Sequence, residues 1–178
     1  CLSRGLGDVY KRQVVTVANA QSTGNVTLNI KLNPIQTLVV NSKQTTVDLN
    51  YTTKNDYANG VSVDQADHLT VYSTGGFQVK VKASGSQLTG KANNINVSDV
   101  TLTASNGTQA LSNSASFSSA QLSAEDKVIV SSSKGGVDKT INVNYAAKGD
   151  NNAYLDYYQN TENPTVFTTT LTYTIVAQ

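Results

Sequence analysis

The chain has 178 residues, of which 14% are charged, and its formal net charge at pH 7 is +1. A protein that binds nucleic acid needs a basic surface to neutralise phosphates, and a composition this close to neutral excludes that class. No apolar run approaches the roughly 20 residues that a membrane-spanning helix requires. Apolar residues never recur at helical spacing over three turns, so we expect strands instead of helices.

Residues 1–13 are unlike the rest of the chain. Within them, residues 3–13, SRGLGDVYKRQ, resemble the in-frame translation of a transposon sequencing adaptor. We therefore interpret residues 1–13 as a sequencing artefact and leave them out of the fold prediction. They contain every arginine and the only cysteine, and without them 10 of the 13 basic and 11 of the 12 acidic residues remain. The native chain would then have no disulfide and a net charge of about −1.

The following residues, 14–20, read VVTVANA and predict the end of a signal peptide. Ala18 and Ala20 form the A-x-A pattern after which signal peptidase cleaves. An ordinary first β-strand is the alternative. We expect an exported protein whose mature chain starts at Gln21 and, at roughly 160 residues, is long enough to bury one core.

Apolar and polar residues alternate with a period of two along the rest of the chain, which predicts short β-strands. Two glycine pairs, Gly75-Gly76 and Gly135-Gly136, predict tight hairpins, because glycine accepts the positive φ angles of such turns. The expected strands are residues 24–32, 35–40, 45–51, 69–72, 77–82, 95–102 with a bulge at 98–99, a weaker strand ending at Phe117, 127–132, 137–145 and 165–176, with a helical turn at 121–126.

Eight to ten short strands in one stretch without a linker predict an all-β fold. We expect an immunoglobulin-like β-sandwich over residues 34–178. Residues 21–33 would precede it as a separate strand segment.

Candidate catalytic and metal-binding residues are few. The one histidine, His68, follows Asp64 and Asp67. This trio could serve as a metal or acid–base site, although a polar stretch before a strand accounts for it equally well. A Ser–His–Asp triad would depend on the same histidine, and no stretch has the spacing of a calcium-binding loop. We therefore expect no enzymatic activity, no metal and no cofactor.

A long surface loop is expected at residues 148–163, and it contains Tyr154, Tyr157 and Tyr158. Tyrosine is common where proteins contact ligands, because it offers a large surface at little cost in entropy. These three residues form a candidate ligand patch, which would suit a self-contained carbohydrate-binding or adhesive module at the cell surface. The alternative is a loop held against the sheet by its own rings.

The most informative stretch is residues 24–32, which follow the expected cleavage site and are separated from the next strand by Pro34. Such a stretch can pair within its own domain as a first strand. It can also extend and complete the sheet of a neighbouring molecule by strand addition. The apolar positions that alternate with polar ones are Val26, Leu28, Ile30 and Leu32.

Residues 25–34, NVTLNIKLNP, resemble the mature N-terminus of pilins of the alternate chaperone–usher pathway, the colonisation-factor type of fimbriae. In that family an Asn-apolar-Thr-apolar start opens a run of four alternating apolar residues, and a proline follows two positions later. The resemblance implies an incomplete immunoglobulin-like fold whose groove is filled by the N-terminal strand of the next subunit. It also implies a homopolymeric filament on the surface of a Gram-negative bacterium, with a periplasmic chaperone and an outer-membrane usher as partners.

The resemblance assigns roles to individual residues. The four alternating apolar side chains would be the donor residues, and burying them would contribute about 6–12 kcal/mol gross, at roughly 1.5–3 kcal/mol each. The acceptor groove would be lined by the first and last strands of the sandwich, through Ile35, Leu38, Val40, Phe167, Leu171, Tyr173 and Ile175.

Overall fold

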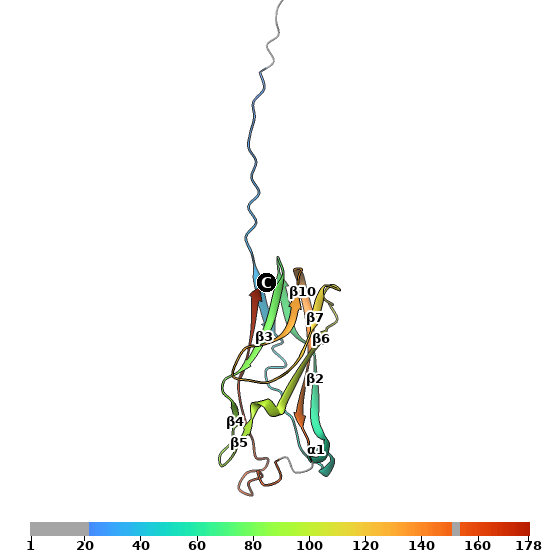
Figure 1. The fold of residues 1–178 in the computed structure, drawn as a ribbon, viewed down its shortest axis with the longest axis vertical. Coiled ribbons are helices and arrows are strands. Elements are labelled where there is room, and N and C mark those ends of the chain that lie inside the picture. The colour runs from blue at the N-terminus through green and yellow to red at the C-terminus, as the bar shows by residue number, and fades with distance from the viewer. Residues whose placement is uncertain (1–21, 151–153) are drawn as a thin grey trace, which may run out of the picture. The chain divides into compact units, whose positions relative to one another are not determined.

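The computed structural model describes residues 22–150 and 154–178. The chain divides into two units, Cys1–Leu32 and Asn33–Gln178. Residues 22–32 of the first unit form neither helix nor strand. All the helices and strands of the described residues belong to the second unit (Figure 1).

Two antiparallel sheets make up most of the second unit (Figure 1). One has five strands in the order β1-β2-β10-β6-β8, and the other has four in the order β11-β3-β9-β7, while β4 and β5 form a separate two-stranded ladder. The all-β class predicted from the sequence is confirmed. The strands are β1 Gln36–Val40, β2 Gly60–Ser73, β3 Phe77–Ala83, β4 Gln87–Thr89, β5 Asn94–Asn96, β6 Val100–Asn106, β7 Ala115–Phe117, β8 Ser119–Gln121, β9 Lys127–Ser132, β10 Gly136–Lys148 and β11 Leu171–Ala177.

Buried side chains of both sheets form one core. In β3, Phe77, Val79 and Val81 are at most 1% exposed, and the polar residues between them face outward, as the period of two requires. Burying a side chain of this size stabilises the fold by about 1.5–3 kcal/mol. The core residues contributed by the other long strands include Leu69, Val71, Leu102, Ile129, Val130, Ile141 and Val143.

The two Gly-Gly turns join strands of different sheets, so both predicted hairpins are wrong. β2 belongs to the five-stranded sheet and β3 to the four-stranded sheet, and β10 and β9 are divided in the same way. β2 pairs with β1 along one edge and with β10 along the other. Because no edge of β2 remains free for β3, the chain crosses from one sheet to the other at each turn.

Each crossing begins at a buried serine. The hydroxyl of Ser73 donates to the carbonyl of Gly75 at 2.7 Å, and that of Ser132 donates to the carbonyl of Lys134 at 2.8 Å. The two turns also approach each other closely, since a Cβ atom on Gly135 would overlap the carbonyl oxygen of Ser73. Glycine is needed at this position for close packing between two crossings, not for a hairpin.

Four other predicted elements differ in form. Residues 45–51 are extended but belong to no strand. The strand expected at residues 95–102 is divided by η1, a 3-10 turn at Val97–Asp99, instead of containing a bulge. Residues 121–126 contain no helical turn, and the last strand begins at Leu171, later than the predicted residue 165.

The helix α1, Lys54–Asn59, was not predicted. Thr53 caps its N-terminus, and Asp56 completes a capping box by accepting from the Thr53 backbone. The helix ends at Gly60, which must be glycine for two reasons. Its φ is +86°, and any Cβ atom there would overlap the carbonyl oxygen of Ala147. β2 starts at this glycine beside the end of β10.

Candidate functional site

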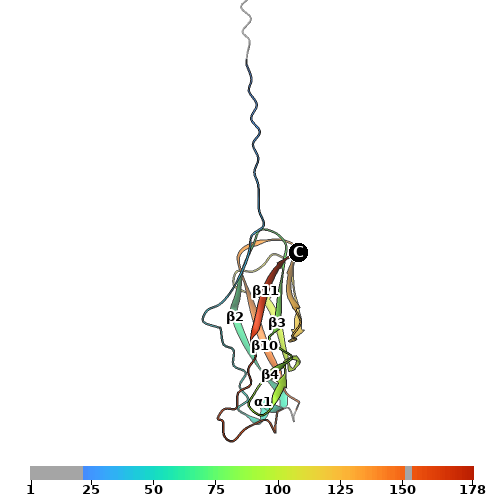
Figure 2. The same ribbon diagram turned by 90° about the vertical axis from the view of Figure 1, so that its left-hand side faces the viewer.

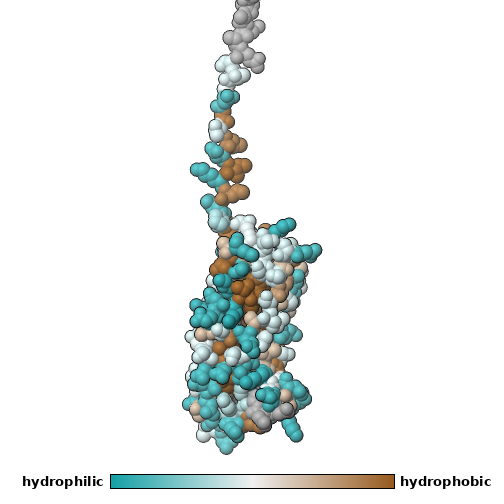
Figure 3. Space-filling view, viewed as in Figure 1, coloured by the Kyte–Doolittle hydropathy of each residue, from teal (hydrophilic) through white to brown (hydrophobic). Residues whose placement is uncertain are grey.

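The segment that precedes the second unit exposes its apolar residues. Val26 is 93%, Leu28 86%, Ile30 81% and Leu32 89% exposed. Figure 3 shows apolar and polar residues alternating along this stretch. The expected strand at residues 24–32 has no partner strand among the described residues. Four large aliphatic side chains in water, repeated at the spacing of a strand, indicate an interaction surface.

Each of the two main sheets has two edge strands, β1 and β8 in one and β11 and β7 in the other. β1 pairs only with β2, and β11 pairs only with β3, among the residues that the structure describes. β1 and β11 lie next to each other on the same side of the unit (Figure 2). Their outward backbone N–H and C=O groups are free to pair with another strand.

Five of the seven predicted acceptor residues border this open edge. Their side chains are half-buried and pack against the margin of the core. Ile35 is instead 52% exposed and precedes β1. Phe167 lies before β11, where its ring packs on Tyr157 at a centroid distance of 6.0 Å. The five residues at the edge are Leu38, Val40, Leu171, Tyr173 and Ile175.

Residues 45–51 follow β1 after a turn and turn one face toward the core. Val47 and Leu49 pack against the core, as the side chains of a strand would, and Tyr51 is half-buried. Within the described part of the chain, however, the backbone of this stretch makes no hydrogen bond. The period-two pattern correctly indicated an extended segment with one face inward, but the partner strand is missing.

A chain of hydrogen-bonded side chains lies beneath the two edges. Nδ1 of His68 contacts Oε1 of Gln44 at 2.9 Å, and Nε2 of His68 contacts the hydroxyl of Tyr145 at 2.8 Å. The Tyr145 hydroxyl in turn contacts that of Tyr173. Gln44 donates through Nε2 to the carbonyl of Ala66, so its oxygen accepts from His68. These hydrogen-bonded side chains connect the five-stranded sheet to β11.

Burial sets the protonation of this polar chain. His68 is 2% exposed, and burial lowers its pKa below the ordinary value. Burial raises the pKa of Tyr145 to about 12 and also raises the pKa of Tyr173. A neutral imidazole that donates to Gln44 and accepts from Tyr145 satisfies every hydrogen bond in the chain. His68 therefore has a structural explanation.

The predicted trio around His68 is not assembled. The carboxylate of Asp64 accepts from Asn144, and that of Asp67 accepts from the backbone and hydroxyl of Thr108. Across residues 22–150 and 154–178, no three His, Cys, Asp or Glu side chains come together as a metal site.

Two of the three patch tyrosines are engaged in packing. The hydroxyl of Tyr154 donates to Asp99 at 3.0 Å, and its ring lies edge-on to Tyr51 and Tyr157 at 5.5 and 5.8 Å. Only Tyr158 is largely in water, at 52% exposed. The rings hold the loop against the rest of the unit, so the three do not present one flat face.

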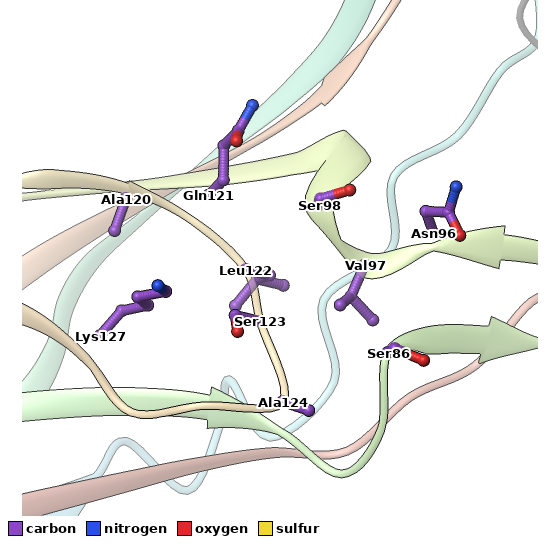
Figure 4. Close-up of a pocket in the computed structure, with 10 residues that line it drawn as sticks. All are labelled: Ser86, Asn96, Val97, Ser98, Ala120, Gln121, Leu122, Ser123, Ala124 and Lys127. Atoms are coloured by element: carbon purple, nitrogen blue, oxygen red, sulfur yellow. The ribbon is translucent and has the colours of Figure 1, made fainter.

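A shallow hollow of about 600 Å³ lies between β8, η1 and the ends of β4 and β9 (Figure 4). Short hydroxyl and amide side chains surround Val97 and Leu122, and Lys127 is the one charged residue. Without a carboxylate or imidazole in its lining, the hollow has no acid–base pair for catalysis.

No protein-family model matches the chain, and no curated protein is significantly similar to it in sequence. None of the helices in the described residues has the length and apolar character needed to cross a membrane.

Proposed function

We propose that this chain is a structural subunit of an extracellular filament, in which residues 24–32 of one copy complete the fold of the next. The observation that supports this is an exposed run of four alternating apolar residues in a chain whose own sheets leave β1 and β11 unpaired at one edge. The second unit would then be an immunoglobulin-like sandwich that lacks one strand until a neighbour supplies it.

The added strand would lie beside β11. Residues 25–32 span about 26 Å when extended, and the seven residues of β11 span about 23 Å. Alternate side chains of the donor would cover the half-buried margin of the core, and its backbone would pair with β11. The unpaired backbone groups of β11 would gain a partner.

A donor that pairs antiparallel to β11 must come from another copy. β1 starts beside Ser73, the place where β11 finishes, and the two strands run in opposite directions. A donor antiparallel to β11 therefore ends at the far end of β11, about 23 Å away. The linker from Leu32 to Gln36 spans no more than about 14 Å. A chain therefore cannot form this full-length antiparallel pairing with its own β11.

The same open edges explain why assembly partners would be needed. A subunit in which β1 and β11 border a bare margin of the core without a further partner is prone to aggregate before its neighbour arrives. A periplasmic chaperone that occupies the edge, and an outer-membrane usher that replaces it, fit this requirement. The filament would then stand on the surface of a Gram-negative bacterium.

Removing the donor segment tests the proposal. A chain without residues 1–32 should be less stable than the polymer, and a synthetic peptide of residues 24–32 should bind it and raise its melting temperature. A control peptide carrying Ile30→Asp should have little effect, because an ionised carboxylate would be buried. A truncated chain that is fully stable and ignores the peptide would refute strand donation.

A self-contained carbohydrate-binding or adhesive module has less support. Tyr154 and Tyr157 are held by other rings, which leaves Tyr158 as the one patch tyrosine that a ligand could reach freely. One exposed ring does not provide the stacked aromatic surface that the module would need.

A further inference from the structure

The second unit has two ends that the strand topology defines. We call the first the Ser73 end: β1 starts there opposite Ser73, β10 starts there at Gly136, and the amide of Gln178 donates to Gly76. We call the other the α1 end: it contains α1 with the start of β2 and the end of β10, and the loop of residues 154–170 reaches it through Tyr154, whose ring packs on Tyr51 (Figure 1). Because residues 33–35 lead into β1, a donated segment is attached to its own subunit at the Ser73 end.

The proposed strand donation places these two ends against each other. A donor segment antiparallel to β11 runs toward the α1 end of its acceptor and finishes beside Leu171, about 23 Å from the Ser73 end of a unit in which β2 spans about 46 Å. Residues 33–35 then allow no more than about 14 Å before β1 of the donor begins. Since the paired segment and this linker together span less than β2, the Ser73 end of the donor would lie against the α1 half of the acceptor, which carries the loop of residues 154–170.

Both ends carry exposed apolar side chains that strand donation does not use. At the α1 end, Leu155, Tyr158 and Val166 are 53%, 52% and 58% exposed. At the Ser73 end, Ile35 and Val137 are 52% and 65% exposed. The linker would bring these two surfaces together, and the apolar side chains of one could pack against those of the other.

The loop at the α1 end is held in place before any partner arrives. The amide of Gln159 donates to the hydroxyl of Thr165 at 2.8 Å, and Thr168 pairs with Thr89 in an isolated bridge. A segment already fixed by such contacts loses less entropy on binding. Charge adds to the match, because exposed Asp156 lies in this loop and exposed Lys134 lies at the Ser73 end.

We propose that Leu155, Tyr158 and Val166 of one copy pack against Ile35 and Val137 of the copy that donates its strand. This second contact rests on the proposed function and would fix the angle between successive subunits. Five side chains make an interface too small to hold two free proteins together. A strand that tethers the two surfaces at millimolar effective concentration makes such a contact sufficient.

Cysteine cross-linking of the full chain tests the contact. In a Cys1→Ser background, Val137→Cys combined with Tyr158→Cys should give a ladder of covalent oligomers after mild oxidation or with a short bismaleimide, and reductant should remove the disulfide ladder. The pair Ile35→Cys and Val166→Cys is a second test. Cross-linking should be on the order of a hundredfold faster than between untethered copies.

The matched control is Val39→Cys with Tyr158→Cys. Val39 is 59% exposed but lies within β1, away from the Ser73 end, so no ladder should form. A ladder of equal strength in this control would overturn the contact. A cross-link formed by Val137→Cys alone would also overturn the contact, because it would mean that two Ser73 ends meet.

Electron microscopy of the same samples separates the two proposals. Filaments without a ladder from either cysteine pair would overturn the contact and leave strand donation intact. Absence of any polymer would refute strand donation, and the contact with it. A ladder that disappears when Ile30→Asp is added would show that the contact depends on the donated strand.

Discussion

Residues 24–32 and β3 have the same sequence pattern and opposite environments. In β3, Phe77, Val79 and Val81 alternate with polar residues and are at most 1% exposed. In residues 24–32, four aliphatic residues alternate in the same way and are 81–93% exposed. Alternation thus identifies a segment able to form a strand, but the location of its partner comes from the rest of the fold.

The difference arises from what surrounds each segment. β3 lies between β11 and β9, so both of its edges are paired and one face covers the core. Residues 24–32 have the pattern of a core strand but form no strand themselves, while β11 pairs only with β3 among the described residues. Strand donation would join these two observations, and substitutions in each segment test how far the comparison holds.

The largest difference is expected when one aromatic or aliphatic side chain is truncated in each segment. Phe77→Ala should lower the free energy of unfolding by about 3–5 kcal/mol, because it opens a cavity in the core. Leu28→Ala should change it by no more than about 0.5 kcal/mol in the monomeric chain. Urea unfolding at low protein concentration measures both. A large loss for Leu28→Ala would mean that the segment packs within its own monomer.

The second test concerns association. Ile30→Asp should weaken binding of the segment to the truncated subunit by at least about a hundredfold, which corresponds to about 2.7 kcal/mol, because an ionised carboxylate would replace a buried aliphatic group. Lys31→Asp is the matched control on the alternate face and should bind nearly as well as the native peptide. Calorimetric titration compares the two, and equal losses would argue against a period-two contact.

The strand pattern could be read from the sequence because period-two alternation depends only on local residues. Predicted strands at residues 35–40 and 127–132 correspond to β1 and β9. The pairing of strands could not be read in this way. Glycine pairs after Ser73 and Ser132 suggested hairpins, whereas each buried serine marks a crossing between sheets.

The candidate site was partly predictable for the same reason. Alternation identified Leu171, Tyr173 and Ile175 as one inward face of the last strand. Alternation could not show that residues 45–51 would lack a partner strand, because the local sequence pattern does not depend on whether a neighbouring strand is present. The link from Gln44 through His68 to Tyr173 joins residues far apart in the chain, and only the fold brings them together.

The third test asks whether the hydrogen bonds from His68 through Tyr145 to Tyr173 hold β11 in place before a donor strand binds. Tyr173→Phe removes the hydroxyl that joins β11 to Tyr145 and should lower the free energy of unfolding by about 1–2 kcal/mol, since a buried hydrogen bond is lost. Tyr158→Phe is the control, because its hydroxyl makes no hydrogen bond with the described residues. If the two variants were equally stable, the polar chain would not contribute to holding β11.

The smallest expected effect is the pH dependence of the same polar chain. Burial lowers the pKa of His68 in the folded state, so the unfolded chain binds a proton first as the pH falls through about 6.5. Stability is therefore complete above that value and decreases at up to about 1.4 kcal/mol per pH unit, until the pH reaches the lowered pKa of the folded state. Urea unfolding between pH 8 and pH 5 measures this slope, and His68→Gln should remove the contribution of the histidine.

The donor segment, residues 24–32, contains no histidine, so a chain without this segment should show the same slope. If removing the segment changed the slope, the segment would have to affect the protonation of His68. Residues 24–32 would then contact the folded unit, as β3 does, in spite of their high exposure.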